Sequence, residues 1–319
     1  MTAATETSEI YPISTFIHDL PVTLSATLPR EAGGAAVAAP PPAPPPGSIS
    51  ARRLIIIGDV HGLRKSLEAL LDAVGFDKSQ GDEVIFVGDL VSKGPDSGAV
   101  IDFAGRIGAR GVRGNHDDAV LRAAQRLKMG AGHDCHDDDD DNDGAAEGAG
   151  EDRGGKKEKK KRSVSARTAA ALSDSQLEYL ASLPLMVRIT ATPSLPGIEQ
   201  IVVVHAGLVP RVPLEEQPAH AVMHMRSLRA VEGCLVPLEE AGERGWIVEW
   251  DAWQEECAGK TMVVFGHDAK RRLQRGKYAL GLDTACVYGG KLSAWVVEAG
   301  EARVVQVDCA DEVDEVRGS

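Results

Sequence analysis

The fold is first indicated by the nine residues LIIIGDVHG, Leu54 to Gly62. The four aliphatic residues at the start of this segment are typical of a buried strand, and Gly58 ends the strand. The leucines that follow recur at helical spacing as far as Val74, which predicts a helix after the turn. A carboxylate, Asp59, and an imidazole, His61, therefore stand between a strand and a helix.

The same order of strand, turn and helix occurs twice more. A second strand is expected over Val84 to Val87, ending at Gly88, and a helix begins after Pro95-Asp96-Ser97. A third strand runs into Gly111 to Gly114, and a further helical pattern follows it. Three such units in succession predict an α/β sheet.

The second half of the chain is richer in strands. A helix is expected over Asp174 to Leu183. Short apolar or alternating runs then predict a series of strands. These strands are expected at 185–189, 201–204, 262–265, 278–282, 292–297 and 303–307.

The composition is that of an acidic globular protein. The 319 residues include 48 Asp plus Glu and 35 Lys plus Arg, a formal net charge of −13, which argues against broad binding to nucleic acid or anionic lipid. Aromatic residues make up only 4%, so a stacking surface for single-stranded nucleic acid is not expected. Five cysteines without a CxxC pair favour free thiols. No run approaches ~20 apolar residues and no secretory signal is evident, so the cytoplasm is the expected location.

Two segments differ in composition from the rest. Gly33 to Pro46 reads GGAAVAAPPPAPPP, which favours an extended linker. Farther on, the acids of Asp137 to Asp141 and the basic block Lys156 to Arg162 predict a disordered insertion, and the basic block leaves a nuclear location open. The expected organisation is a tail at 1–50, a domain at 51–309 with its insertion at about 129–164, and a C-terminal tail at 310–319.

Five short motifs place a carboxylate, amide or imidazole directly after a strand. These groups are expected to converge, because the carboxyl ends of strands in an α/β sheet lie at one edge. Three Asp or Asn and three His make a mixed oxygen and nitrogen donor set for two divalent metals ~3.5–4 Å apart, with Asp89 as the natural bridging carboxylate. The motifs are GDVHG at 58–62, GDLVSKGP at 88–95, RGNHD at 113–117, HAG at 205–207 and GHD at 266–268.

In this order the motifs resemble those of the calcineurin-like metallophosphoesterases. The resemblance is narrower to the branch that contains Ser/Thr phosphoprotein phosphatases and bacterial diadenosine tetraphosphatase (ApaH), and it covers roughly Arg53 to Asp308 apart from the insertion. It implies an α/β (α+β) fold, a sandwich of two β-sheets flanked by helices with a dimetal site at one rim. The implied metal ligands are Asp59 and His61 for one ion, Asp89 as the bridge, and Asn115, His205 and His267 for the other.

The resemblance also implies how phosphate esters or anhydrides would be hydrolysed. Mn, Zn or Fe ions would activate a hydroxide that attacks phosphorus in line, and His116 would protonate the leaving oxygen. Lys93, Arg113 or Arg226 would balance charge on the phosphoryl oxygens. Two alternatives stay open, namely Arg113 as a member of a structural ion pair and Arg226 as a surface arginine.

The second motif departs from the protein-phosphatase pattern GDYVDRG. Ser92 stands in place of the aspartate that orients the catalytic histidine, and Lys93 replaces the arginine, so bidentate phosphate binding is lost there. The segment GDLVSKGPDS is similar to that of eukaryotic ApaH-like phosphatases. So are MRSL at 225–228 and GLDTACVYGGKL at 281–292, in which Ala285 replaces the usual glycine.

The sequence therefore predicts a metal-dependent phosphoanhydride or phosphoester hydrolase of the ApaH-like type. Candidate substrates are dinucleoside polyphosphates, inorganic polyphosphate and capped RNA, with no membrane partner. The alternative is a Ser/Thr phosphoprotein phosphatase, against which Ser92 and Lys93 argue. A non-catalytic metal-binding scaffold is the third hypothesis, and the complete set of ligands with His116 argues against it.

Overall fold

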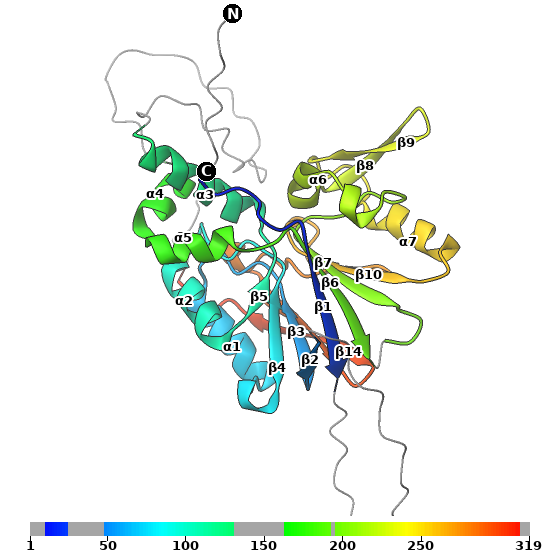
Figure 1. Ribbon diagram of the computed structural model, residues 1–319, viewed down its shortest axis with the longest axis horizontal. Helices are drawn as coiled ribbons and strands as arrows, with labels where there is room; N and C mark the ends of the chain where they lie inside the picture. Colours follow the sequence, from blue (N-terminus) through cyan, green and yellow to red (C-terminus); the bar gives the residue numbers. More distant parts are fainter. Residues whose placement is uncertain (1–9, 25–47, 131–162, 193–194, 313–319) are drawn as a thin grey trace, which may run out of the picture.

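Two mixed β-sheets lie in the middle of the molecule, with helices on both outer sides (Figure 1). The computed structural model describes residues 10–24, 48–130, 163–192 and 195–312. Within these ranges, no helix is long and apolar enough to cross a membrane. The architecture confirms the predicted sandwich.

The five-stranded sheet combines the strands of the first three motifs with a C-terminal hairpin. Its strand order is β14-β13-β3-β4-β5, and the three strands that carry motifs run parallel to one another. Their carboxyl ends therefore meet at one edge. The strands are β3 (Arg53–Ile57), β4 (Asp82–Phe86), β5 (Arg110–Gly111), β13 (Lys291–Glu298) and β14 (Glu301–Asp308).

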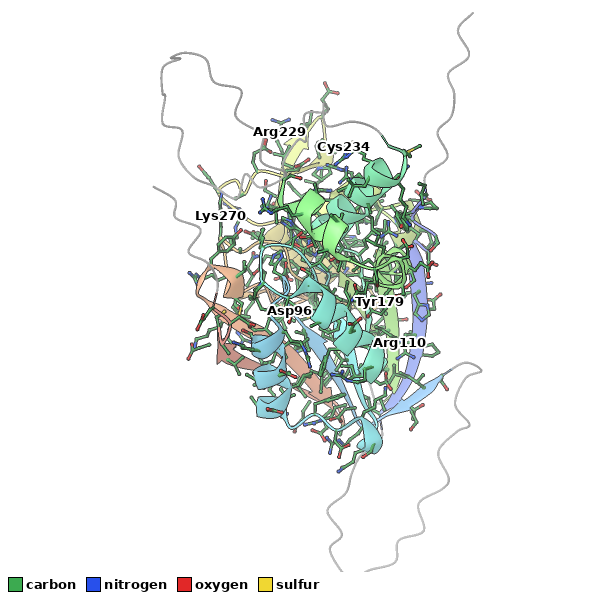
Figure 2. All side chains as sticks on the ribbon, turned by 90° about the vertical axis from the view of Figure 1, so that its left-hand side faces the viewer. Asp96, Arg110, Tyr179, Arg229, Cys234 and Lys270 are labelled. Atoms are coloured by element: carbon green, nitrogen blue, oxygen red, sulfur yellow. The ribbon has the colours of Figure 1, made fainter. Side chains whose placement is uncertain are left out.

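The second sheet has seven strands and carries the last two motifs. Its order is β11-β12-β10-β7-β6-β1-β2, and β7 and β10 run parallel, so that their carboxyl ends are also neighbours. The strands are β1 (Ile17–Leu24), β2 (Ile49–Ala51), β6 (Met186–Thr192), β7 (Gln200–Val204), β10 (Thr261–Phe265), β11 (Gln274–Arg275) and β12 (Ala279–Gly281). A separate hairpin of β8 (Ser227–Val231) and β9 (Cys234–Leu238) carries Arg229 and Cys234 (Figure 2).

The helices form two groups (Figure 1). The first group packs on the outer face of the five-stranded sheet and consists of α1 (Arg64–Val74), α2 (Ser97–Ile107), α3 (Asn115–Lys128), α4 (Val164–Ala171) and α5 (Asp174–Ala181). The second packs on the seven-stranded sheet and consists of α6 (Ala219–His224) and α7 (Ile247–Glu256). Short 3-10 turns lie at Lys78–Gln80, Leu214–Glu216 and Cys286–Tyr288.

Alternation along β3 explains why two layers of core form. Leu54 and Ile56 belong to the core between the two sheets, whereas Ile55 and Ile57 belong to the core under the first helix group. All four are fully buried. Because burying one such side chain contributes about 1.5–3 kcal/mol, the strand holds both cores together and fixes the position of the motif that follows it.

Strand β1 corrects the expectation that residues 1–50 are a disordered tail. It pairs in parallel with β6 at seven positions. Leu20, Val22 and Leu24 alternate into the core between the sheets and are 2–3% exposed. The alternation was the available signal, but Pro21 and the Pro/Ala-rich run that follows made the composition resemble a linker. That run, at 33–46, lies outside the described residues.

The expected C-terminal tail at 310–319 is also corrected at its start. Asp311 accepts hydrogen bonds from the backbone N–H of Lys65 at 3.1 Å and of Ser66 at 2.8 Å, and from the Ser66 hydroxyl at 2.6 Å. These N–H groups belong to the first turn of α1 and have no partner within the helix. The carboxylate therefore attaches the chain end to α1. Most of the charged insertion, 131–162, lies outside the described residues.

Asp82 holds two arginines at the amino end of β4. Its fully buried carboxylate accepts hydrogen bonds from Arg52 Nη2 at 2.8 Å and from Arg53 Nη2 at 2.6 Å. Burial raises the pKa of Asp82, but the bonds from Arg53 and Arg52 outweigh it and lower the pKa to about 2. The folded protein therefore favours the ionised form of Asp82 more than the unfolded chain does.

We expect Asp82→Asn to lower the free energy of unfolding by about 3 kcal/mol at pH 7, because it leaves the buried Arg53 without its counter-ion. The folded-state pKa lies below the unfolded-state value of about 3.9. This electrostatic contribution is therefore complete above that pH and is lost as pH falls towards 2. Urea unfolding at pH 7 and pH 3 should show a smaller difference between variant and wild type at pH 3. An equal difference at both values would contradict the ion-pair account.

Candidate metal centre

All six predicted metal ligands lie at one rim of the sandwich. Each follows the carboxyl end of a strand, either in the five-stranded sheet (β3, β4, β5) or in the seven-stranded sheet (β7, β10). Each side chain is buried, with 5% exposure or less. The structure therefore brings together Asp59, His61, Asp89, Asn115, His205 and His267.

Asp89 occupies the middle of this group. One carboxylate oxygen, Oδ2, lies 3.7 Å from His61 Nε2, and the other, Oδ1, lies 3.5 Å from His205 Nε2. Oδ1 also accepts a hydrogen bond from the backbone N–H of His116 at 3.0 Å. The two oxygens thus face ligands from opposite sheets, which is the arrangement that a bridging carboxylate requires.

Hydrogen bonds to backbone carbonyls orient the three imidazoles. His61 Nδ1 lies 3.2 Å from Val91 O, and His205 Nδ1 lies 2.9 Å from Val87 O. In His267 the pattern is reversed, with Nε2 3.0 Å from His224 O. A histidine that donates one N–H to a carbonyl presents the other nitrogen as a metal donor. The nitrogens that face the centre are therefore Nε2 of His61 and His205 and Nδ1 of His267.

Two glycines make room for the carboxylates. A Cβ atom on Gly114 would lie 2.1 Å from Asp89 Oδ1, and a Cβ on Gly266 would lie 1.9 Å from Asp59 Oδ1. Both distances are far below contact distance, so no larger residue fits without movement of the ligands. This close approach is the physical reason for glycine beside Asn115 and His267.

Backbone strain is concentrated at the centre. Six of the ten non-glycine residues with positive φ in the described ranges lie in its loops. Such conformations cost on the order of 1–3 kcal/mol each and persist where the surrounding structure enforces them, often at functional sites. The six are His61, Asp89, Ser92, Lys93, His267 and Ala285.

The electrostatics of the donor set fit a bound cation. Burial and the nearby carboxylates of Asp283 and Asp89 raise the pKa of Asp59 well above its usual value. Burial lowers the pKa of His205 to about 3. A bound cation would relieve the repulsion between these carboxylates. Carboxylates and neutral imidazoles together are ligands that divalent transition metals prefer. Sequence reasoning gave no role to Asp283, which acts here through its charge.

His116 lies at the same centre, and two cationic side chains act on it through their charge. The His116 ring stacks edge-on against His61 at 5.0 Å between centroids. Burial, followed by the charges of Lys93 and His61, lowers the pKa of His116 well below its usual value, and Arg226 adds to the effect. The charges of Lys93 and Arg226 therefore both act on His116.

Arg113 lies elsewhere, which corrects its assignment as a phosphate-binding residue. Its fully buried guanidinium forms an ion pair with Asp118 at 3.2 Å and donates to Ala181 O at 2.7 Å and Pro12 O at 3.4 Å. These contacts join α3, α5 and the segment before β1. The structural ion pair that the sequence left open is the observed role.

Two single substitutions would distinguish the structural role of Arg113 from the phosphate-binding role proposed for Arg226. Arg113→Met should lower the free energy of unfolding by about 3 kcal/mol, because Asp118 and two carbonyls lose their buried donor. Arg226→Met should leave unfolding nearly unchanged and raise KM. Thermal melts and steady-state kinetics of both variants are the measurements. A raised KM for folded Arg113→Met would restore the phosphate-binding assignment.

Asp117 is a further residue whose role the sequence did not reveal. Its buried carboxylate accepts backbone hydrogen bonds from Asp89 at 2.9 Å, Leu90 at 3.0 Å and Gly114 at 3.0 Å. Burial and the charge of Asp89 raise its pKa to about 8, while these donors act in the opposite direction. The side chain fixes the loop that presents Asp89. Its position in the RGNHD motif was the only signal, and the motif does not say which way the carboxylate points.

The two-sheet sandwich and the buried Asp and His groups at its strand ends match the metallophosphoesterase fold. The chain belongs to the calcineurin-like phosphoesterases, whose family model matches residues 52–278. It is thus a phosphoesterase, a class of hydrolase.

Several relatives share most of the chain. A symmetrical bis(5'-nucleosyl)-tetraphosphatase from Acidovorax sp. (strain JS42) is 25% identical, over 76% of this chain and 90% of the relative. The asymmetrical enzyme PrpE of Oceanobacillus iheyensis is 24% identical, over 76% and 88%. A crystal structure provisionally described as a diadenosine tetraphosphatase is 34% identical, covers 81% of this chain and 94% of its own, and has a TM-score of 0.61.

Proposed function

We propose that this phosphoesterase hydrolyses a phosphoanhydride bond of a dinucleoside polyphosphate. Two Mn, Zn or Fe ions would be held by the six ligands at the rim, Asp89 among them. The observation that carries the proposal is the buried Asp and His donor set around Asp89, in which a ring nitrogen of His116 lies within 4.8 Å of ligand atoms of His61 and Asp89. We assign Lys93 and Arg226 to the phosphates, because two separate cations suit a chain of several phosphates better than a single phosphoryl group. The similarity to symmetrical and asymmetrical tetraphosphatases supports the same substrate class.

The protein residues have three separate tasks in this reaction. When bound, the metals would supply Lewis-acid stabilisation and a nucleophile at neutral pH. Lys93 and Arg226 bind phosphoryl oxygens of the substrate. His116, held beside Asp89 by its own backbone N–H, delivers a proton to the departing phosphate oxygen.

Ser92 favours an anhydride over a phosphoserine or phosphothreonine substrate. Its buried hydroxyl has no hydrogen-bond partner among the described residues, and its N–H donates to Ser97 Oγ at 3.1 Å. Position 92 thus carries a hydroxyl where the protein-phosphatase pattern has the carboxylate that orients the catalytic histidine. A departing phosphate has a second pKa of about 6 and needs a weaker acid than a departing alkoxide does.

The test is a matched substrate panel with Mn, Zn or Mg supplied to the full chain. It contains diadenosine tetraphosphate, long-chain inorganic polyphosphate, a capped RNA and a phosphothreonine peptide. We expect the highest kcat/KM for diadenosine tetraphosphate, and chromatography of the nucleotides will distinguish two ADP from ATP plus AMP. A higher kcat/KM for polyphosphate or capped RNA would overturn the assignment of a dinucleoside polyphosphate and keep that of a phosphoanhydride. Preference for the phosphopeptide would overturn the proposal.

A further inference from the structure

A second cluster of metal-binding side chains lies beside the proposed dimetal centre and contains none of its ligands. His220, His224 and Glu239 each place one ligand atom within 4.8 Å of the others. His220 and His224 are four residues apart on α6, so their side chains share one helix face. Glu239 directly follows β9 and comes to them from the neighbouring hairpin.

Contacts within this cluster hold its three side chains together. His220 Nε2 lies 2.7 Å from Glu239 Oε1. The two imidazole rings stack with centroids 4.1 Å apart and an angle of 16° between their planes. The His224 side chain is buried, which fixes one donor, whereas the side chains of His220 and Glu239 are 69% and 53% exposed and can adjust around an ion.

We propose that His220, His224 and Glu239 form a further metal site, for a transition-metal ion of the Zn²⁺ type. Two imidazoles and one carboxylate are a donor set that zinc uses in proteins, with water in the remaining position. Mg²⁺ and Ca²⁺ prefer oxygen ligands and would bind here weakly. The i, i+4 spacing of the histidines on a helix is a common way to hold such an ion.

The site has a direct structural connection to the catalytic rim. The backbone carbonyl of His224 lies 3.0 Å from His267 Nε2, and this contact turns Nδ1 of His267 towards the centre. Arg226, two residues on, donates to the backbone carbonyl of Glu239 at 3.1 Å. A metal on the three side chains would therefore restrain α6, the start of β8 and the end of β9, the segments that position His267 and Arg226.

The experiment is a count of bound metal. The full chain is stripped with a chelator, loaded with Zn²⁺, passed through a desalting column and analysed for zinc per polypeptide. His220→Ala and Glu239→Gln should each bind one equivalent less than the wild type. His18→Ala, which removes an exposed histidine from β1, should bind as much as the wild type and controls for non-specific loss. Because residues 220 and 239 are exposed, the variants should retain the wild-type melting temperature without metal.

A second readout identifies the ligands of the lost ion. Cobalt loading should give a visible ligand-field absorption, part of which disappears in His220→Ala. Asp89→Asn should lose ions from the dimetal centre and keep the component that depends on His220. This separates failure of the further site from failure of the proposed function. Equal zinc content in wild type, His220→Ala and Glu239→Gln would overturn the inference and leave His220 and Glu239 as a hydrogen-bonded pair.

Discussion

Replacing Asp89 with asparagine is expected to remove most metal from the proposed dimetal centre and to lower kcat/KM by more than about 100-fold. That is the upper end of the loss seen when a group that only supports a metal ligand is changed. Asp89 is placed more directly, with one oxygen 3.7 Å from His61 Nε2 and the other 3.5 Å from His205 Nε2. Asparagine keeps an oxygen for the His116 N–H but lacks the negative charge that two cations require.

The metal-free form of this variant provides the decisive control. The charge of Asp89 contributes to the raised pKa values of Asp59 and Asp117, so these buried carboxylates repel one another. Without metal, Asp89→Asn should therefore melt at the same temperature as the wild type or higher. Asp72→Asn makes the same change at an exposed position on α1 and should leave metal content and turnover unaltered. A variant of Asp89 that keeps its full metal content would refute the bridging role.

The sequence predicted β3, β4, β7 and β10 because each contains a short apolar run that ends at a glycine or at a ligand, whereas β5, Arg110–Gly111, has no such run. Leu54–Ile57 and Ile201–Val204 are buried on both faces, and such strands read as continuous apolar runs. β1 was missed because three of its eight residues are polar and one is proline. The sheet pairing that stabilises it, with β6, joins residues about 170 positions apart and leaves no local signal.

The site shows the same division between local and distant information. Ligands could be predicted because their type and their place after a strand are properties of a few adjacent residues. The direction in which an arginine side chain points is not determined by its neighbours in the sequence. Arg113 points away from the centre because Ala181 O and Pro12 O accept its N–H groups, and these residues are 68 and 101 positions away in the sequence. The charge of Asp283 likewise acts on Asp59 only because folding brings these distant positions together.

Replacing His116 with asparagine is expected to lower turnover of diadenosine tetraphosphate by about 100- to 1,000-fold, the range for loss of a general acid, with metal content unchanged. The backbone N–H of residue 116 still donates to Asp89, so the loop should keep its shape. Burial, Lys93 and His61 lower the pKa of His116, which favours neutral imidazole in the free enzyme. A polyphosphate anion bound at Lys93 and Arg226 would favour the imidazolium form again, as proton donation requires.

The dependence on the leaving group gives this prediction its sharpest test. The dinitrophenolate of 2,4-dinitrophenyl phosphate departs without a proton, so His116→Asn should impair its hydrolysis much less than that of diadenosine tetraphosphate. An equal loss for both substrates would refute the general-acid role. Loss of metal in the variant would instead make His116 a ligand, since its ring nitrogen lies within 4.8 Å of ligand atoms of His61 and Asp89. His18→Asn, at an exposed position on β1, is the matched control and should retain wild-type kinetics, because His18 does not belong to the buried donor set of the centre.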